Sequence, residues 1–314
     1  MTTNQTKPIH NVVSMSGGKD STALAIVALE RNTPNLRFVF ADTGHEHAQT
    51  YDYVEYLRGA LGIEIETVRA DFAKAIERKR ETIGGKWRDD GVPEEKIQRA
   101  LNVMRPTGNP FLDMCMVAGR FPSTRARFCS RQLKHDPIQI LIDDLMKGAQ
   151  AVISWQGVRA DESHARRNLP ERDVEFGTWE PDPAGLLIYR PIIAWTVEDV
   201  FAAHRRAGIE PNPLYAQGMG RVGCMPCIHA RKAELREIAA RFPDEIARVA
   251  EWERIVSDAS KRDASTFFPT ADGRGGTLAD VIEWSRTTRG GKQYDLLAAA
   301  DEPTMCSSIY GLCE

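Results

Sequence analysis

A glycine pair between an apolar strand and an apolar helix constrains the fold of this chain more than any other feature. The segment Ser14-Met-Ser-Gly-Gly-Lys-Asp-Ser21 follows Val12-Val13 and precedes an apolar helical stretch over 22–29. Two glycines let the backbone turn tightly beside a ligand, and the positive end of the following helix points at the turn. We therefore expect a phosphate-binding loop, although the sequence is not the GxxxxGK[ST] of the common P-loop. The alternative is an ordinary Gly-Gly turn, which the surrounding hydroxyl and lysine side chains disfavour.

Strand and helix patterns alternate on both sides of this loop. They predict strands over 11–14, 36–41 and 64–68, and helices over 21–30 and 47–61. This order is typical of a parallel sheet covered by helices. Residues 72 to about 122 are charged and broken by glycine and proline, which predicts a helical insertion or lid. The later patterns predict a basic helix over 131–146, a strand over 151–155, a strand-to-helix turn over 191–206 with Thr196 as N-cap, and helices from 228 to about 260.

Composition and charge limit where such a protein works. The formal net charge of −3 gives no overall attraction to nucleic acid or to an anionic membrane, so any basic site must be local. No stretch reaches the ~18 apolar residues of a membrane span, and the first residues lack the features of a signal peptide. We therefore expect a cytoplasmic protein. Six cysteines in a reducing compartment are more often free, catalytic or metal-bound than paired in disulfides.

Polar clusters follow two of the predicted strands. Asp42-Thr43-Gly44 ends the second strand at the carboxyl edge, where open α/β sheets bind ligands; its alternative role is to cap the helix over 47–61. Arg159 and Arg166 follow the strand over 151–155. Guanidinium groups bind phosphate or sulfate oxygens in bidentate fashion, although loop arginines are commonly only solvated.

A basic segment surrounds Cys129. Such a segment would lower the pKa of a thiol and attract an anionic substrate or a nucleic-acid backbone. Its alternative role is a solvated helix face. The basic residues are Arg120, Arg125, Arg127, Arg131 and Lys134.

Four segments resemble, in the same order, the phosphoadenosine-phosphosulfate (PAPS) and adenosine-phosphosulfate (APS) reductase family of the PP-loop superfamily. They are the SxSGGKDS loop, FADTGHEHAQTYDYVEYL from Phe40, WQGVRADESHAR from Trp155, and the block Arg190–Cys227 with its Asn-Pro-Leu-Tyr and Gly-Cys-x-x-Cys. The resemblance implies an α/β fold with a parallel, doubly wound, HUP-like sheet. It implies a nucleotide-binding domain over 1–227 with an insertion over about 72–128, and a helical, Cys-containing C-terminal region over 228–314.

The resemblance also implies the site residues. Lys19, Arg159 and Cys313 are the predicted catalytic residues. The reductases end in a Glu-Cys-Gly-Leu motif whose cysteine attacks sulfur, whereas this chain has the same residue types in another order, Gly311-Leu312-Cys313-Glu314, so Cys313 does not follow from the resemblance alone. The adenine nucleotide, with Mg²⁺ as a candidate companion, is predicted to bind at Ser14, Ser16, Gly17, Gly18, Lys19, Asp20, Ser21, Asp42, Thr43, Gly157, Arg159 and Arg166.

The cysteines form a second motif. Cys224 and Cys227 make a CxxC in a Gly/Pro-containing turn, and two such thiolates can face one metal centre. With Cys129 they resemble the iron–sulfur APS reductases and the DNA phosphorothioation sulfurtransferases, which implies a [4Fe–4S] cluster. Ser130 stands where the APS reductases have a second adjacent cysteine, so the fourth ligand must lie elsewhere. We favour Cys306, with Cys313 as the free thiol and Cys115 as an ordinary core residue.

Two reactions fit these motifs. In one, a cysteine thiolate attacks the sulfur of APS or PAPS, and a thioredoxin-like donor releases sulfite. In the other, ATP activates an acceptor, such as a nucleic acid, and a cysteine or the cluster delivers sulfur. An alternative from another class is a zinc-stabilised nucleotide- or nucleic-acid-binding protein without redox chemistry. A further rival, the small subunit of sulfate adenylyltransferase, shares the first two motifs but needs no CxxC.

Overall fold

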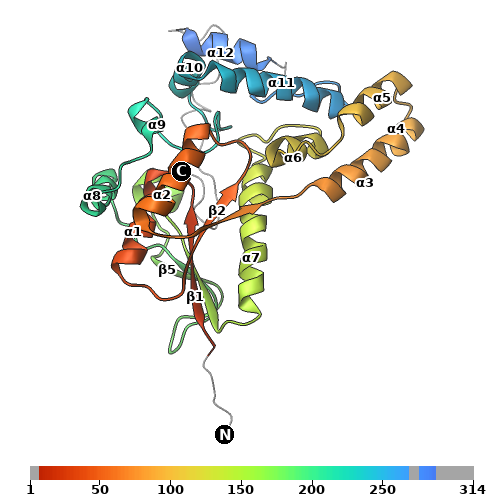
Figure 1. Cartoon of the computed structure of the whole chain (residues 1–314). Coiled ribbons are helices and arrows are strands. Elements are labelled where there is room, and N and C mark those ends of the chain that lie inside the picture. The colour runs from red at the N-terminus through yellow and green to blue at the C-terminus, as the bar shows by residue number, and fades with distance from the viewer. Residues whose placement is uncertain (1–6, 269–275, 288–314) are drawn as a thin grey trace.

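A six-stranded sheet forms the centre of the computed structural model, which describes residues 7–268 and 276–287 (Figure 1). The order of the strands is β3-β2-β1-β4-β6-β5. Strands β1, β2, β3, β4 and β6 pair in parallel, as predicted, whereas β5 runs antiparallel to β6. The strands are β1 (Ile9–Met15), β2 (Leu36–Asp42), β3 (Ile65–Arg69), β4 (Ala151–Trp155), β5 (Arg172–Thr178) and β6 (Ala184–Tyr189).

Helices cover both faces of this sheet, so the doubly wound α/β class is confirmed. Val13 of β1 faces the core formed with α1 (Lys19–Glu30) and α2 (Ala48–Leu61). Its neighbour Val12 faces the opposite core, formed with α7 (Asp136–Met146). This alternation follows from the period of two along a strand, because both faces are buried. A further helix, α8 (Val197–Ala207), lies against α1.

The chain reverses its direction of travel across the sheet between β1 and β4. From β1 it moves outward through β2 to β3, and it later returns to β4 on the other side of β1. In open α/β sheets such a switch point leaves a crevice at the carboxyl ends of the two strands, where ligands bind. The Ser14–Ser21 loop lies at this crevice.

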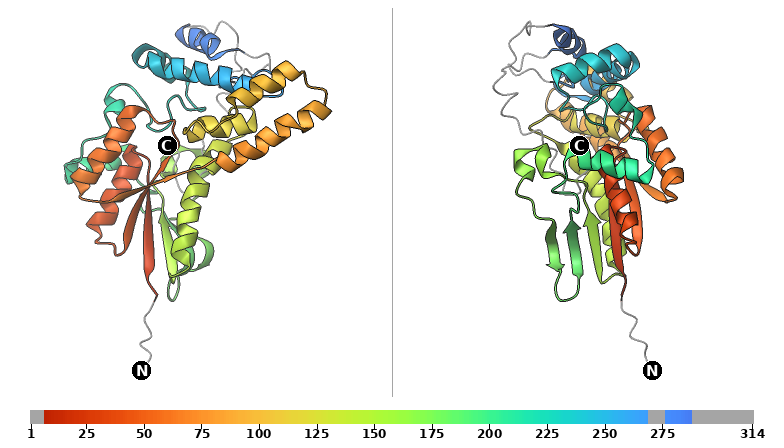
Figure 2. Two further views of the ribbon diagram at one scale, coloured as in Figure 1. Left: turned by 45° about the vertical axis from the view of Figure 1, so that its right-hand side comes forward. Right: turned by 90° about the vertical axis from the view of Figure 1, so that its left-hand side faces the viewer.

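The remaining helices form a second layer beside the carboxyl edge of the sheet (Figures 1 and 2). The predicted insertion is helical, and its helices share one hydrophobic core with the helices that follow residue 231. Phe111, Trp252 and Phe267 lie in this core. The inserted helices are α3 (Ala73–Gly84), α4 (Lys86–Asp89), α5 (Glu94–Val103) and α6 (Pro110–Ala118); the later ones are α10 (Lys232–Arg241), α11 (Pro243–Ala259) and α12 (Leu278–Arg286). The short α9 (Pro213–Ala216) precedes them, and its Leu214 packs in a separate, smaller core.

Two local predictions differ from the structure. The basic segment before α7 is a π-helical turn, Ser130–His135, and π-turns are common beside functional sites. The strand expected near Pro191 lies earlier, at β6, while residues 191–194 form a turn; Thr196 caps α8 as predicted, accepting from Asp199 N–H at 3.2 Å. Among the described residues, no helix is long and apolar enough to cross a membrane.

Candidate active site

The Ser14–Ser21 loop is a tight turn from the end of β1 into α1. Gly17 has φ +77°, and a Cβ there would lie 2.8 Å from Thr50 Cγ2, so the turn requires glycine. Inside the turn, the Ser16 backbone N–H donates to Ser21 Oγ at 3.1 Å, and the two hydroxyls lie 2.9 Å apart. The buried Ser14 hydroxyl has no hydrogen-bond partner among the described residues. The loop is built as the sequence indicates, and its phosphate binding stays a prediction.

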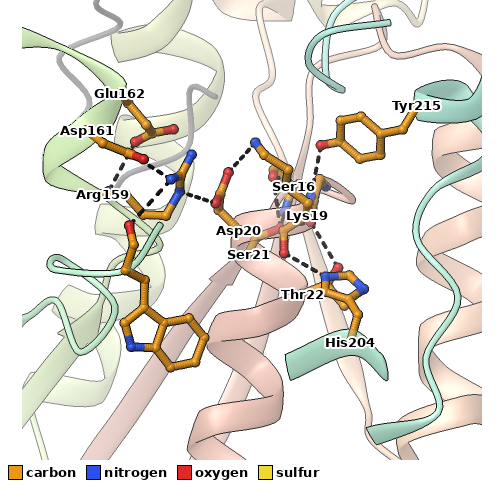
Figure 3. Close-up of polar contacts among 12 residues, drawn as sticks. Ser16, Lys19, Asp20, Ser21, Thr22, Arg159, Asp161, Glu162, His204 and Tyr215 are labelled. Atoms are coloured by element: carbon orange, nitrogen blue, oxygen red, sulfur yellow. Dashed lines mark hydrogen bonds and ion pairs between the residues drawn. The ribbon is translucent and has the colours of Figure 1, made fainter. Parts of the chain in front are cut away.

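Asp20 is fully buried and joins two cations of this site (Figure 3). Its Oδ2 lies 2.6 Å from Lys19 Nζ, and its Oδ1 lies 2.5 Å from Arg159 Nε. Arg159 also donates from Nη1 to Asp161 at 2.6 Å. Burial lowers the pKa of Arg159, but Asp20, Asp161 and Glu162 outweigh that effect and raise it. The predicted anion-binding arginine is therefore held in place by carboxylates in this structure.

The loop after β4 packs directly on the start of α1. A Cβ on Gly157 would lie 3.2 Å from the Asp20 carbonyl oxygen, so a larger residue would push β4 away from the loop. Arg166 pairs with Glu162, which also accepts from the Arg159 backbone N–H at 3.1 Å. The structure thus brings Gly157, Arg159 and Arg166 to the Ser14–Ser21 loop. Asp161 and Glu162 were not among the predicted site residues, although they stand in the same motif.

A pocket of about 440 Å³ opens beside Lys19. His229 lies in its wall, and burial, aided by Arg221 and Arg127, lowers the pKa of His229 to about 4, so the imidazole is neutral at pH 7. The other titratable lining residues are five cations and three carboxylates, so the walls favour an anion. They are Lys19, Arg159, Arg166, Arg221 and Arg231, with Glu162, Glu234 and Glu237.

The Asp-Thr-Gly turn after β2 is held by its own hydrogen bonds. Asp42 Oδ1 accepts from Gly44 N–H at 2.8 Å and from the Tyr51 hydroxyl at 2.7 Å. The Thr43 hydroxyl donates to Glu46 Oε1 at 2.7 Å. Asp42 is not the cap of α2, because the N-cap is His47, whose Nδ1 accepts from Gln49 N–H at 3.2 Å.

Cysteines from two distant parts of the chain gather at the end of this turn. Cys224 forms a β-bridge with Glu46, and its Sγ lies 3.7 Å from Thr43 Oγ1. Lys134 of the π-helical turn interacts electrostatically with all three predicted ligands. Burial lowers the pKa of Lys134, but the negative charges of Cys224, Glu46, Cys227 and Cys129 outweigh burial and raise it. Burial, then Cys227, raises the pKa of Cys129 to about 11. The structure therefore places Cys129, Cys224 and Cys227 near one another and near the partly buried side chain of Lys134.

His45 and Arg248 hold the CxxC turn and were not singled out in the sequence. Arg248 Nη2 lies 3.3 Å from His45 Nδ1 and donates to the Met225 carbonyl at 3.1 Å. Because guanidinium can only donate, Nδ1 accepts, and Nε2 carries the proton given to the Pro226 carbonyl at 2.9 Å. Burial, then Arg248, lowers the pKa of His45 to about 3. Only the fold brings these residues together, so no local sequence signal could have identified them.

The other three cysteines do not join this group in the part of the chain that the structure describes. Cys115 is fully buried in the core of the insertion, where burial raises its pKa. Cys306 and Cys313 lie outside the described residues. Over residues 7–268 and 276–287, no group of three or more His, Cys, Asp or Glu side chains is arranged to hold a single metal ion.

Comparison with known proteins places this geometry in a family. The model of the phosphoadenosine phosphosulfate reductase domain matches residues 10–230. A 37.8 kDa uncharacterised protein in the gpa 5′ region of Escherichia phage 186 is 54% identical, over 97% of this chain and 96% of that protein.

More distant relatives carry reductase names. The phosphoadenosine 5′-phosphosulfate reductase of Vibrio campbellii is 22% identical, over 64% of this chain and 60% of its own length. A crystal structure of the phosphoadenylyl-sulfate reductase of Candida auris aligns with a TM-score of 0.42 and 18% identity, over 68% of this chain and 81% of that one. Since the family model spans the strands β1 to β6, the Ser14–Ser21 loop and the CxxC turn, the chain belongs to the phosphoadenosine phosphosulfate reductase domain family.

Proposed function

We propose that this protein binds an adenine nucleotide, either ATP or adenylyl sulfate with or without a 3′-phosphate, and carries out sulfur transfer or sulfonucleotide reduction in the cytoplasm. One observation carries the proposal: the segment that lines the cationic pocket beside Lys19 also carries the CxxC thiols. Gly218, Gly220, Arg221, His229 and Arg231 line this pocket, and Cys224 and Cys227 lie between them in the sequence. A nucleotide anchored at the Ser14–Ser21 loop would therefore present its far end to the thiols.

The negative charges of the nucleotide would be bound by the cationic side chains of the site. Phosphate oxygens would meet the glycine turn and Lys19, with Mg²⁺ as a companion of ATP, while Asp42 and Thr43 would border the nucleoside. Arg159 and Arg166 would face the sulfate or outer phosphates, held in position by Asp20 and Glu162. Preset donors of this kind cost little reorganisation when an anion arrives.

The cysteine site fits an iron–sulfur cluster in its donor chemistry. Three thiols from two distant segments lie near the partly buried ammonium of Lys134, which would stabilise the thiolates that a cluster needs. Cys129, Cys224 and Cys227 would be three ligands and Cys306 the fourth. When bound, such a cluster supplies electron transfer or sulfur at the substrate. Cys313 would serve as the nucleophile.

Two reactions can be written for this site. In reduction, a thiolate attacks the sulfate sulfur, the bond from sulfur to the adenylyl oxygen breaks, AMP leaves, and a thioredoxin-like dithiol then releases sulfite. In transfer, ATP adenylates an acceptor oxygen with loss of pyrophosphate. The outer sulfur of a cysteine persulfide, formed by an external sulfur donor, then displaces AMP, and a dithiol cleaves the S–S bond to release the thiolated acceptor and the cysteine. A nucleic acid is a candidate acceptor because Arg120, Arg125 and Arg131 are exposed beside Cys129.

The deciding experiment incubates anaerobically purified protein separately with ATP, APS and PAPS. Sulfite and AMP or 3′-phospho-AMP, released in the presence of a dithiol donor, would identify reduction. Pyrophosphate from ATP would identify transfer. Absence of binding and of turnover with all three nucleotides would contradict the proposal.

Metal analysis of the same preparation tests the cysteine site. We expect about four irons per chain, with loss of iron and visible absorbance in Cys129→Ser, Cys224→Ser, Cys227→Ser and Cys306→Ser. Cys115→Ser is the matched control, because its thiol lies in the core of the insertion and should leave iron content unchanged. Stoichiometric zinc without iron would instead favour the zinc-stabilised binding protein.

A further inference from the structure

The N-terminus of α1 is capped by a residue from another part of the chain. Its N-cap is Gly18, which has no side chain to satisfy the first amides of the helix. The Lys19 backbone N–H donates to the Tyr215 hydroxyl at 2.9 Å (Figure 3). Tyr215 lies in α9, 196 positions later in the chain. Its ring also lies near the other end of Lys19, with Nζ 5.7 Å from the ring centroid.

Two more side chains from the same region fasten the turn. Asn212 is buried, and its Nδ2 donates to the Gly17 carbonyl at 3.1 Å. His204 Nε2 donates to the Lys19 carbonyl at 2.8 Å, since a carbonyl can only accept. Burial lowers the pKa of His204, which keeps this ring neutral with its hydrogen on Nε2. We call His204, Asn212 and Tyr215 the clasp.

The clasp binds the part of the loop that we expect to face the phosphate. Its three hydrogen bonds reach Gly17 and the backbone N–H and carbonyl of Lys19, whereas the hydroxyls of Ser16 and Ser21 bond to each other and to the backbone of Gly18. The chain then continues from Tyr215 into Gly218 and Gly220 of the pocket wall. The clasp thus fixes the loop relative to the part of the pocket wall that contains Gly218 and Gly220.

We propose that Tyr215 and Asn212 are positioning residues that hold the Ser14–Ser21 loop in its phosphate-binding conformation. This inference rests on the proposed function, because it assigns them a role in binding nucleotide phosphate. The Asn-Pro-Leu-Tyr segment acts through Gly17 and Lys19. It therefore sets affinity for the charged part of the ligand and leaves affinity for the nucleoside unchanged.

The test uses Tyr215→Phe, which removes only the hydroxyl, and Asn212→Asp. The latter keeps the Oδ1 that accepts from Leu214 N–H at 3.0 Å and replaces the Nδ2 donor. Tyr189→Phe is the matched control, because its hydroxyl accepts from Arg31 at the opposite end of α1. Calorimetry would measure affinity for ATP, adenylyl sulfate and adenosine. Hydrogen exchange would follow the Lys19 amide in the nucleotide-free proteins.

The expected result is selective. Tyr215→Phe and Asn212→Asp should weaken ATP and adenylyl sulfate by about fivefold, the usual effect of losing a helix cap. Both should leave adenosine affinity unchanged. Tyr215→Phe should also speed exchange of the Lys19 amide by a similar factor, and Tyr189→Phe should do neither.

Four outcomes would overturn the inference. Unchanged exchange at Lys19 in Tyr215→Phe would show that the hydroxyl does not hold the loop. Equal losses of affinity for adenosine and for ATP would show that the clasp stabilises the fold in general and does not act on phosphate binding. Wild-type affinity for ATP and adenylyl sulfate in both variants would refute the inference alone, whereas a wild-type protein that binds no nucleotide, even with a protected Lys19 amide, would refute the proposed function with it.

Discussion

One buried carboxylate organises the charge of the candidate site. Asp20 pairs with Lys19 through one oxygen and with Arg159 through the other. Removing one partner of such a buried pair commonly costs about 3–5 kcal/mol, because the remaining charge stays desolvated. Asp20 thus keeps the cations of α1 and of the loop after β4 at fixed positions before any anion arrives. Its partner Arg159 lies 139 positions away, so the sequence could name both residues but not their pairing.

Lys19→Ala should weaken nucleotide binding most among the loop variants. Loss of a charge-assisted hydrogen bond to phosphate costs about 2 kcal/mol, or roughly thirtyfold in affinity. Calorimetric titration with ATP would measure it. Lys147→Ala is the control, because Lys147 forms only an exposed pair with Asp144. Unchanged affinity in a folded Lys19→Ala protein would contradict the assignment.

Gly17→Ala should destabilise the fold more than Gly91→Ala. Both glycines have positive φ, +77° and +72°, so both variants lose about 1 kcal/mol to backbone strain. Only at Gly17 does the new Cβ also meet Thr50 Cγ2, which raises the cost to about 3 kcal/mol. Urea denaturation of the two variants would give the difference. Equal midpoints would show that the loop can relax away from α2.

His45 should make stability depend on pH. Its pKa falls from 6.5 in the unfolded chain to about 3 in the folded protein, so its stabilising effect is complete above pH 6.5 and is lost as the pH falls toward 3. At pH 5 the loss is about 2 kcal/mol. Urea denaturation of the metal-free protein at pH 7 and pH 5 should show a smaller difference for His45→Gln than for wild type. An identical difference would mean that other groups carry the effect.

At the scale of elements, the sequence predicted those helices and strands whose own residues carry a clear apolar pattern. The apolar strands and amphipathic helices from β1 to β3 lie within a few residues of their predicted bounds, because β1 and β2 are buried on both faces and therefore apolar along most of their length. Strand β5 was missed since its residues are charged and mostly exposed, and it is a strand only because β6 pairs with it. The misplaced strand near Pro191 arose from apolar residues that pack in a turn.

The aromatic core between α6 and α11 supports the cysteine turn. Phe111 stacks on Trp252 with centroids 5.6 Å apart and on His45 at 4.2 Å, and His45 binds the carbonyl of Pro226. Phe111→Ala should cost about 3–5 kcal/mol of stability and expose the CxxC thiols. Phe176→Ala is the control, since Phe176 is exposed on β5. Calorimetric melting and the rate of thiol labelling would measure the two effects, and unaltered labelling in Phe111→Ala would remove the link to the cysteines.

At the scale of the whole molecule, the insertion and the later helices act together. Residues from α3 to α6 and from α10 to α12 contribute to one core, although three of the six strands, β4 to β6, lie between them in the sequence. The division into 1–227 and 228–314 stays a prediction. The cysteine site lies where this helical layer meets the carboxyl edge of the sheet, and its three described thiols could be gathered only by the complete fold.

The strand order also determines which strands can pair while the chain is still being synthesised. β1 pairs with β2 as soon as both are made, but its other edge must wait for β4, which follows the whole insertion. At ordinary rates of translation that wait lasts on the order of 10 s. During it the central strand of the future sheet has an open edge, and the turn around Gly17 still lacks Tyr215. A nascent chain halted within the insertion should therefore be vulnerable to proteases and to pairing with other chains, and nucleotide should protect it only after α9 has left the exit tunnel.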